Sequence, residues 1–168
     1  TWNLVIEGHA KSQNERASHN TANIMDQMLE FGKKHPDVKP DKVTITSMLK
    51  SLVRKATKGN QNSGRQAVDI LDKMIESYSS GNELMKPDKI IFSTVINCVA
   101  KCGRSDAGSE ALLLLNRMLK MHKEGYSNLK PDTVTLNTTL SALANTQTAE
   151  AAEQAGKLLQ AMLKSNDD

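Results

Sequence analysis

Apolar residues recur along the chain at steps of three and four, which is the spacing of one face of a helix. In two successive segments these positions are Ile45, Met48, Leu49 and Leu52, then Ala67, Ile70, Leu71 and Met74. The β-branched runs VTIT, IIFST and VTLNTT have the composition of strands, but the apolar spacing around them favours helices. The pattern therefore predicts an all-α fold.

Short sequence motifs recur along the chain with a long period. Lys-Pro-Asp occurs three times, with prolines at 40, 87 and 131, so the spacings are 47 and 44 residues. A second signal is a small residue followed seven positions later by Met. Its occurrences are Thr21/Met28, Ala67/Met74, Ala111/Met118 and Ala155/Met162. Two independent signals with one period predict tandem structural units.

Each unit is predicted to be a pair of helices, with boundaries at 1–41, 42–88, 89–132 and 133–168. The first unit is truncated at its start and the last at its end, which suggests a fragment of a longer protein. Asp41, Asp88 and Asp132 are suited to cap the first helices, and Gly81 and Gly125 to end the second helices. The polar stretch 58–64 is predicted to be a flexible loop. Stacking such pairs buries their apolar stripes, so we expect an α-solenoid of helix-turn-helix repeats.

Composition narrows the possible chemistry. Aromatic residues make up only 3% of the chain, so the core must be aliphatic, with the methionines at 28, 74, 118 and 162 as core residues. A net charge of +3 permits a polyanionic partner without requiring one. The sequence contains no apolar run long enough to span a membrane. Cys98 and Cys102, four residues apart, are expected to pack in the core, with a metal or redox role as the alternative.

No catalytic motif is recognisable, so the chain is not expected to be an enzyme and no cofactor is expected. There is no nucleophile–base set, phosphate-cradling glycine loop or metal-ligand cluster in the sequence. The three aspartates cannot share one metal, because packed helices lie about 8–10 Å apart. A catalytic domain outside this fragment would not be visible in it.

The combined pattern resembles the pentatricopeptide repeat (PPR) family. It consists of Pro-Asp, a first helix such as KVTITSML, and a second helix with Ala, an apolar pair and Met. The resemblance covers essentially the whole chain in four units of a long variant, whose extra residues are placed at 55–64 and 75–85, in loops or at helix ends. The tetratricopeptide repeat ranks below it, because the Trp, Leu-Gly, Tyr and late Pro of that repeat are absent.

The resemblance implies binding of single-stranded RNA, about one base per repeat. It implies base contacts from Asn3, Asp41, Thr46, Asp88, Ser93, Asp132 and Asn137. It implies base clamping by Val43, Ile90 and Val134, and phosphate contacts by Lys11, Arg54 and Lys101. The family's pairing preferences give U for Asn3–Asp41, G for Thr46–Asp88 and Ser93–Asp132, and a pyrimidine for Asn137.

The resemblance also implies a mitochondrial or plastid location and a role in RNA processing, stability or translation, with possible further domains in the parent protein. Alternatives remain at this stage. The aspartates could serve only as helix caps, and the polar residues and cations could simply be solvated. A protein-binding α-solenoid scaffold is the other functional class that the pattern allows.

Overall fold

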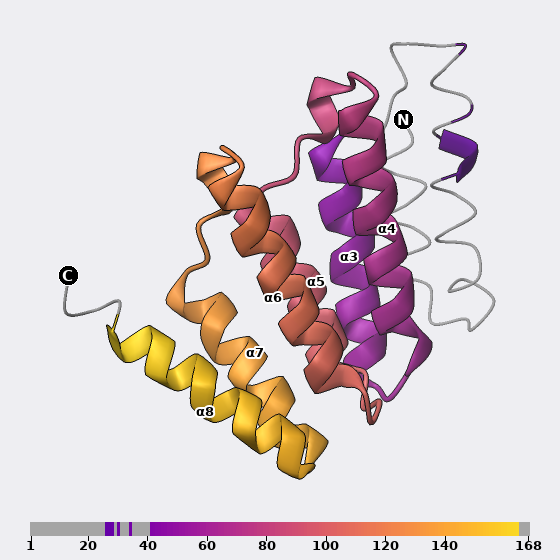
Figure 1. Cartoon of the computed structure of the whole chain (residues 1–168). Coiled ribbons are helices and arrows are strands. Elements are labelled where there is room, and N and C mark those ends of the chain that lie inside the picture. Colours follow the sequence, from indigo (N-terminus) through magenta and orange to yellow (C-terminus); the bar gives the residue numbers. More distant parts are fainter. Residues whose placement is uncertain (1–25, 29, 31–33, 35–40, 165–168) are drawn as a thin grey trace.

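A computed structural model of the chain describes residues 26–28, 30, 34 and 41–164. Its continuous part consists of helices joined by short turns (Figure 1). In chain order the elements are α3 (Lys42–Thr57), α4 (Asn62–Ser79), the 3-10 turn η2 (Glu83–Met85), α5 (Lys89–Lys101), α6 (Ala107–Lys123), the 3-10 turn η3 (Ser127–Leu129), α7 (Thr133–Thr146) and α8 (Ala149–Lys164). The all-α prediction is confirmed, and the described residues contain no strand.

Three helical hairpins, α3–α4, α5–α6 and α7–α8, follow one another in space as they do in sequence (Figure 1). The first helices form a series, because α5 packs against both α3 and α7. The second helix of each of the first two hairpins also packs against the first helix of the next hairpin. These contacts join α4 to α5 and α6 to α7. The arrangement is that of stacked, repeat-like hairpins.

Each first helix begins at the aspartate of a Pro-Asp pair, as predicted. One oxygen, Oδ1, of Asp41 accepts a hydrogen bond from the backbone N–H of Thr44 at 2.8 Å. Oδ1 of Asp88 accepts from the N–H groups of Ile90 and Ile91, both at 3.1 Å. These bonds satisfy amides that have no partner within the helix, which fixes where the helix starts.

The second helices also end as predicted. Gly81 follows α4 with φ at 96°, and Gly125 follows α6 with φ at 107°. This left-handed conformation strains residues that carry a Cβ, so glycine permits the chain to turn sharply toward the next unit.

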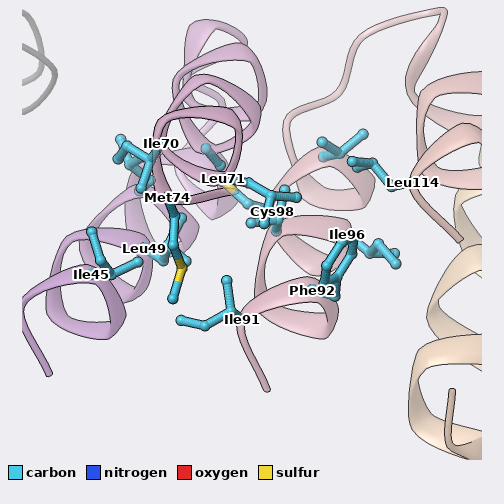
Figure 2. Packing of buried hydrophobic residues seen from close by; sticks show 14 of the residues in the cluster. Ile45, Leu49, Ile70, Leu71, Met74, Ile91, Phe92, Ile96, Cys98 and Leu114 are labelled. Carbon is cyan, nitrogen blue, oxygen red and sulfur yellow. The ribbon is translucent and has the colours of Figure 1, made fainter. Parts of the chain in front are cut away.

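The core is continuous across the hairpins and mainly aliphatic, as predicted, but the aromatic side chain of Phe92 is also fully buried in it. Figure 2 shows Ile45 and Leu49 of α3 facing Leu71 and Met74 of α4, with Ile91 of α5 beside them. Met28, Met74 and Met118 are buried as predicted. Met162 is only partly buried, so its assignment to the core was wrong; it lies on α8, beyond which the described part has no further hairpin.

The predicted loop at 58–64 is shorter in the structure, because residues 58–61 form a turn and residues 62–64 belong to α4. The extra residues at 55–64 lie at helix ends and in this turn, as predicted. Residues 55–57 continue α3, and α4 begins at Asn62, so only a tight turn separates the helices. Asn60 Oδ1 accepts from the N–H of Ser63 at 3.2 Å, and Ser63 and Gly64 are buried. A Cβ on Gly64 would lie 3.0 Å from Cys102 Sγ, so the glycine permits the close approach of α4 to α5.

Candidate functional site

Three large aliphatic side chains are exposed at one repeated position. Val43, Ile90 and Val134 are the second residues of α3, α5 and α7, and they are 61%, 58% and 68% exposed. A single exposed aliphatic residue is ordinary on a protein surface. The same exposure at the same position of three successive first helices defines a surface feature, which we call the aliphatic row.

A polar residue follows each member of the aliphatic row by three positions. These residues are Thr46, Ser93 and Asn137, and the spacing places each on the helix face of its aliphatic neighbour. The hydroxyl of Thr46 donates to the carbonyl of Lys42 at 2.7 Å, and that of Ser93 donates to the carbonyl of Ile90 at 3.1 Å. Since a hydroxyl that donates keeps its lone pairs, both oxygens can still accept a hydrogen bond from a ligand.

Lysines join the first turns of successive first helices. Lys42 Nζ lies 3.3 Å from Asp88 Oδ2, and Lys89 Nζ lies 3.6 Å from Asp132 Oδ2. Each of these two aspartates therefore uses Oδ1 to cap its own helix and Oδ2 to bind the preceding unit. We call the surface made by the caps, these lysines, the aliphatic row and the polar residues at 46, 93 and 137 the first-turn face.

The pKa of Asp132, the cap of α7, is lowered from its usual value. Its pKa is lowered by the backbone N–H of Thr135, which donates at 3.0 Å, then by the Thr135 hydroxyl at 2.8 Å, and further by Lys89. Each of these groups stabilises the ionised carboxylate. The folded pKa thus lies below the unfolded one, so the stabilisation is present above the unfolded pKa and is lost as pH falls through the folded pKa.

Asp132→Ala is expected to reduce the free energy of unfolding at neutral pH by about 1 kcal/mol, because the first amides of α7 lose their acceptor. Asp132→Asn is the control, since asparagine caps equally well but carries no charge to titrate. Urea unfolding from pH 7 down to pH 3 measures both variants. The loss in the free energy of unfolding caused by Asp132→Ala should become smaller toward low pH. A loss that does not depend on pH would contradict the charged cap.

The described residues that are predicted to contact phosphates do not lie on the first-turn face. Arg54 and Lys101 are exposed near the C-terminal ends of α3 and α5. A rise of 1.5 Å per residue places Arg54 about 16 Å along the helix from Val43. The corresponding residue of α7 is the uncharged Asn145. Asn3 and Lys11 lie outside the described residues.

The first-turn face thus contains most of the candidate site residues predicted from the sequence. It also contains two lysines, Lys42 and Lys89, that the sequence analysis did not predict. Val43, Ile90 and Val134 lie with the caps and the polar residues, whereas Arg54 and Lys101 do not. Lys42 and Lys89 were missed. The signal was present, because lysine follows Pro-Asp in two of the three copies, KPDK at 39–42 and 86–89.

A second set of charge pairs joins the second helices. Lys73 Nζ of α4 lies 2.6 Å from Asp26, and Arg117 of α6 forms an ion pair with Asp72 of α4. Lys73 and Arg117 occupy equivalent positions, six residues after Ala67 and Ala111. The hairpins are therefore linked by repeated ion pairs on both helix layers, and the pairs are partly exposed.

The cysteines belong to the core. Cys98 and Cys102 are both fully buried, and Cys98 Sγ lies 3.4 Å from the carbonyl oxygen of Ser63. Burial, aided by neighbouring Cys102, raises the pKa of Cys98 to about 12. In the described part of the chain, no group of three His, Cys, Asp or Glu side chains is placed to hold a metal ion.

The chain matches no known family model, and a search of curated proteins finds no significant match. Within the residues that the structure describes, no helix combines the length and apolar character needed to cross a bilayer.

Proposed function

We propose that this chain is a pentatricopeptide-type α-solenoid that binds single-stranded RNA along the first-turn face. The observation that carries the proposal is the aliphatic row, in which Val43, Ile90 and Val134 stay exposed at one position of three successive helices. A strand that places one base per hairpin meets the same chemistry at each step. Modular reading of this kind is how repeat proteins of this class recognise RNA.

The side chains around the row suit a nucleobase. Branched aliphatic groups offer an apolar surface to a base face, which matters in a chain with only 3% aromatic residues. The hydroxyls of Thr46 and Ser93 and the amide of Asn137 offer short hydrogen-bonding groups to base edges. On the family's preferences, Thr46–Asp88 and Ser93–Asp132 select G and Asn137 selects a pyrimidine. The process served would be organellar RNA processing, stability or translation, without catalysis by this chain.

Removing the aliphatic row should weaken RNA binding. Val43→Ser with Ile90→Ser is expected to raise the Kd for a short single strand containing UGGU by at least tenfold, because two base contacts are lost together. For comparison, one base stacked on an aromatic side chain contributes about 1–3 kcal/mol in single-strand binders. The matched control is Leu113→Ser, because Leu113 is 68% exposed but lies on the second helix α6. Fluorescence anisotropy measures both variants against the parent chain.

The same anisotropy titration distinguishes an RNA-binding protein from a protein-binding scaffold. RNA binding should prefer the UGGU strand to its complement, and it should weaken as salt rises because phosphates contribute. If the parent chain binds no single strand at low salt, the RNA proposal is wrong and the protein-binding scaffold takes its place. Equal losses in the Leu113 control and in the double variant would show that the aliphatic row is not the site.

A further inference from the structure

The two lysines of the first-turn face lie at the N-terminal ends of their helices. Lys42 and Lys89 are the first residues of α3 and α5, immediately before Val43 and Ile90 of the aliphatic row. Each side chain crosses to the aspartate cap of the next first helix, at 3.3 Å for Lys42 and 3.6 Å for Lys89. Each ammonium group therefore lies at the joint between one first helix and the next.

The ion pairs that hold these ammonium groups are easily exchanged. The lysine side chains are 41% and 52% exposed, and both N–O distances are longer than those of close charge-assisted hydrogen bonds. Exposed pairs of this kind contribute little to stability. If Lys42 leaves, Asp88 still accepts two backbone N–H bonds from the first turn of α5, both at 3.1 Å. The aspartate therefore remains hydrogen-bonded when its lysine moves to another anion.

A strand lying on the aliphatic row would bring anions to these joints. In a single strand the phosphates alternate with the bases, so a strand that places bases on Val43 and Ile90 has a phosphate near the joint between them. An ammonium on a flexible stem suits a phosphate as a point charge. Arg54 and Lys101 are farther from the row, at the other ends of the same helices.

We propose that Lys42 and Lys89 are phosphate-binding residues of the first-turn face, each exchanging its aspartate for a phosphate of the bound strand. The inference rests on the proposed binding of single-stranded RNA and adds the residues that hold its backbone. The series ends at α7, where Thr133 takes the position of the lysine. Two phosphates are thus bound in this way by the described hairpins.

The salt dependence of binding tests the inference. Each phosphate neutralised on a single strand contributes about −0.7 to the slope of log K against log salt. Lys42→Gln with Lys89→Gln should therefore make the slope shallower by about 1.4. Between 50 and 200 mM salt, that change reduces the loss of affinity by about sevenfold. The ligand is the UGGU-containing strand, and circular dichroism checks that the variant remains folded.

The matched control removes the same charge elsewhere. Lys120 and Lys157 are also ion-paired, 3.8 Å from Glu124 and 2.7 Å from Glu153, but they lie on the second helices α6 and α8. Their joint replacement by Gln should leave the slope unchanged. Replacement of Lys42 and Lys89 by Arg should restore the parent slope, because arginine keeps the charge.

The outcomes separate this inference from the function on which it rests. A parent chain that binds no single strand refutes the RNA proposal itself. A parent chain that binds, with equal slopes for the Lys42/Lys89 variant and the parent, overturns the phosphate assignment alone. A weaker affinity with an unchanged slope also overturns it, because that result would mean that the lysines only position Asp88 and Asp132.

Discussion

Replacing Gly108 by alanine should destabilise the chain by about 1–3 kcal/mol, the cost typical of overpacking in a tight core. Gly108 is buried on α6 where this helix meets α7. An added Cβ would lie 2.9 Å from the Cα of Leu143 and 3.1 Å from the carbonyl oxygen of Ala142, and it would overlap the hydroxyl of Thr146. Two of these three neighbours are backbone atoms, so the helices must separate to admit the methyl group.

Gly156 supplies the matched control for this substitution. It lies within α8, where an added Cβ meets nothing within 4 Å. Gly156→Ala should therefore stabilise the chain by about 0.5–1 kcal/mol, because alanine loses less backbone entropy than glycine in a helix. Urea unfolding followed by circular dichroism compares the two variants. If both changed stability in the same direction, the close approach of α6 and α7 would be disproved.

The second large effect concerns Cys98, which should react with alkylating agents at pH 8 at least about a thousandfold more slowly than an ordinary cysteine. The thiolate is the reactive species, and a pKa of about 12 in place of 9.0 lowers its population by that factor. The dominant cause is the desolvation of the thiolate in the core, with the nearby Cys102 thiol adding to it. Full burial of the sulfur slows the reaction further.

An exposed reference thiol makes this measurement quantitative. Ser141→Cys on α7 supplies one, since Ser141 is exposed. Mass spectrometry of iodoacetamide-treated protein should show rapid labelling at 141 and labelling of Cys98 only after unfolding in urea. Comparable rates at both positions in the folded chain would revive the redox or metal role that the sequence left open.

The helices and their period could be predicted because they depend on local patterns. Pro-Asp, the three- and four-residue apolar steps and the glycine stops each act within one or two turns. The loop predicted at 58–64 extends three residues too far, because the sequence does not reveal that Gly64 packs beneath Cys102, 38 residues away. A buried glycine and serine look the same in a sequence as those of a flexible turn.

The candidate site was predictable only in part, for a similar reason. Sequence periodicity identifies Val43, Ile90 and Val134 as equivalent, but an aliphatic residue in a helix is by default a core residue. Their exposure is fixed by where the neighbouring hairpins lie. Lys42 was missed because its partner Asp88 is 46 residues away, and such pairing depends on the stacking of hairpins.

The contacts between adjacent hairpins also affect how the molecule can adjust its shape. In the described hairpins, the ion pairs Lys42–Asp88, Lys89–Asp132 and Arg117–Asp72 join adjacent hairpins. Because each hairpin contacts only its neighbours, we expect small rotations at each joint to add along the length of the stack. A ligand that spans several joints would be accommodated by many small adjustments of this kind, without the rearrangement of any single hairpin.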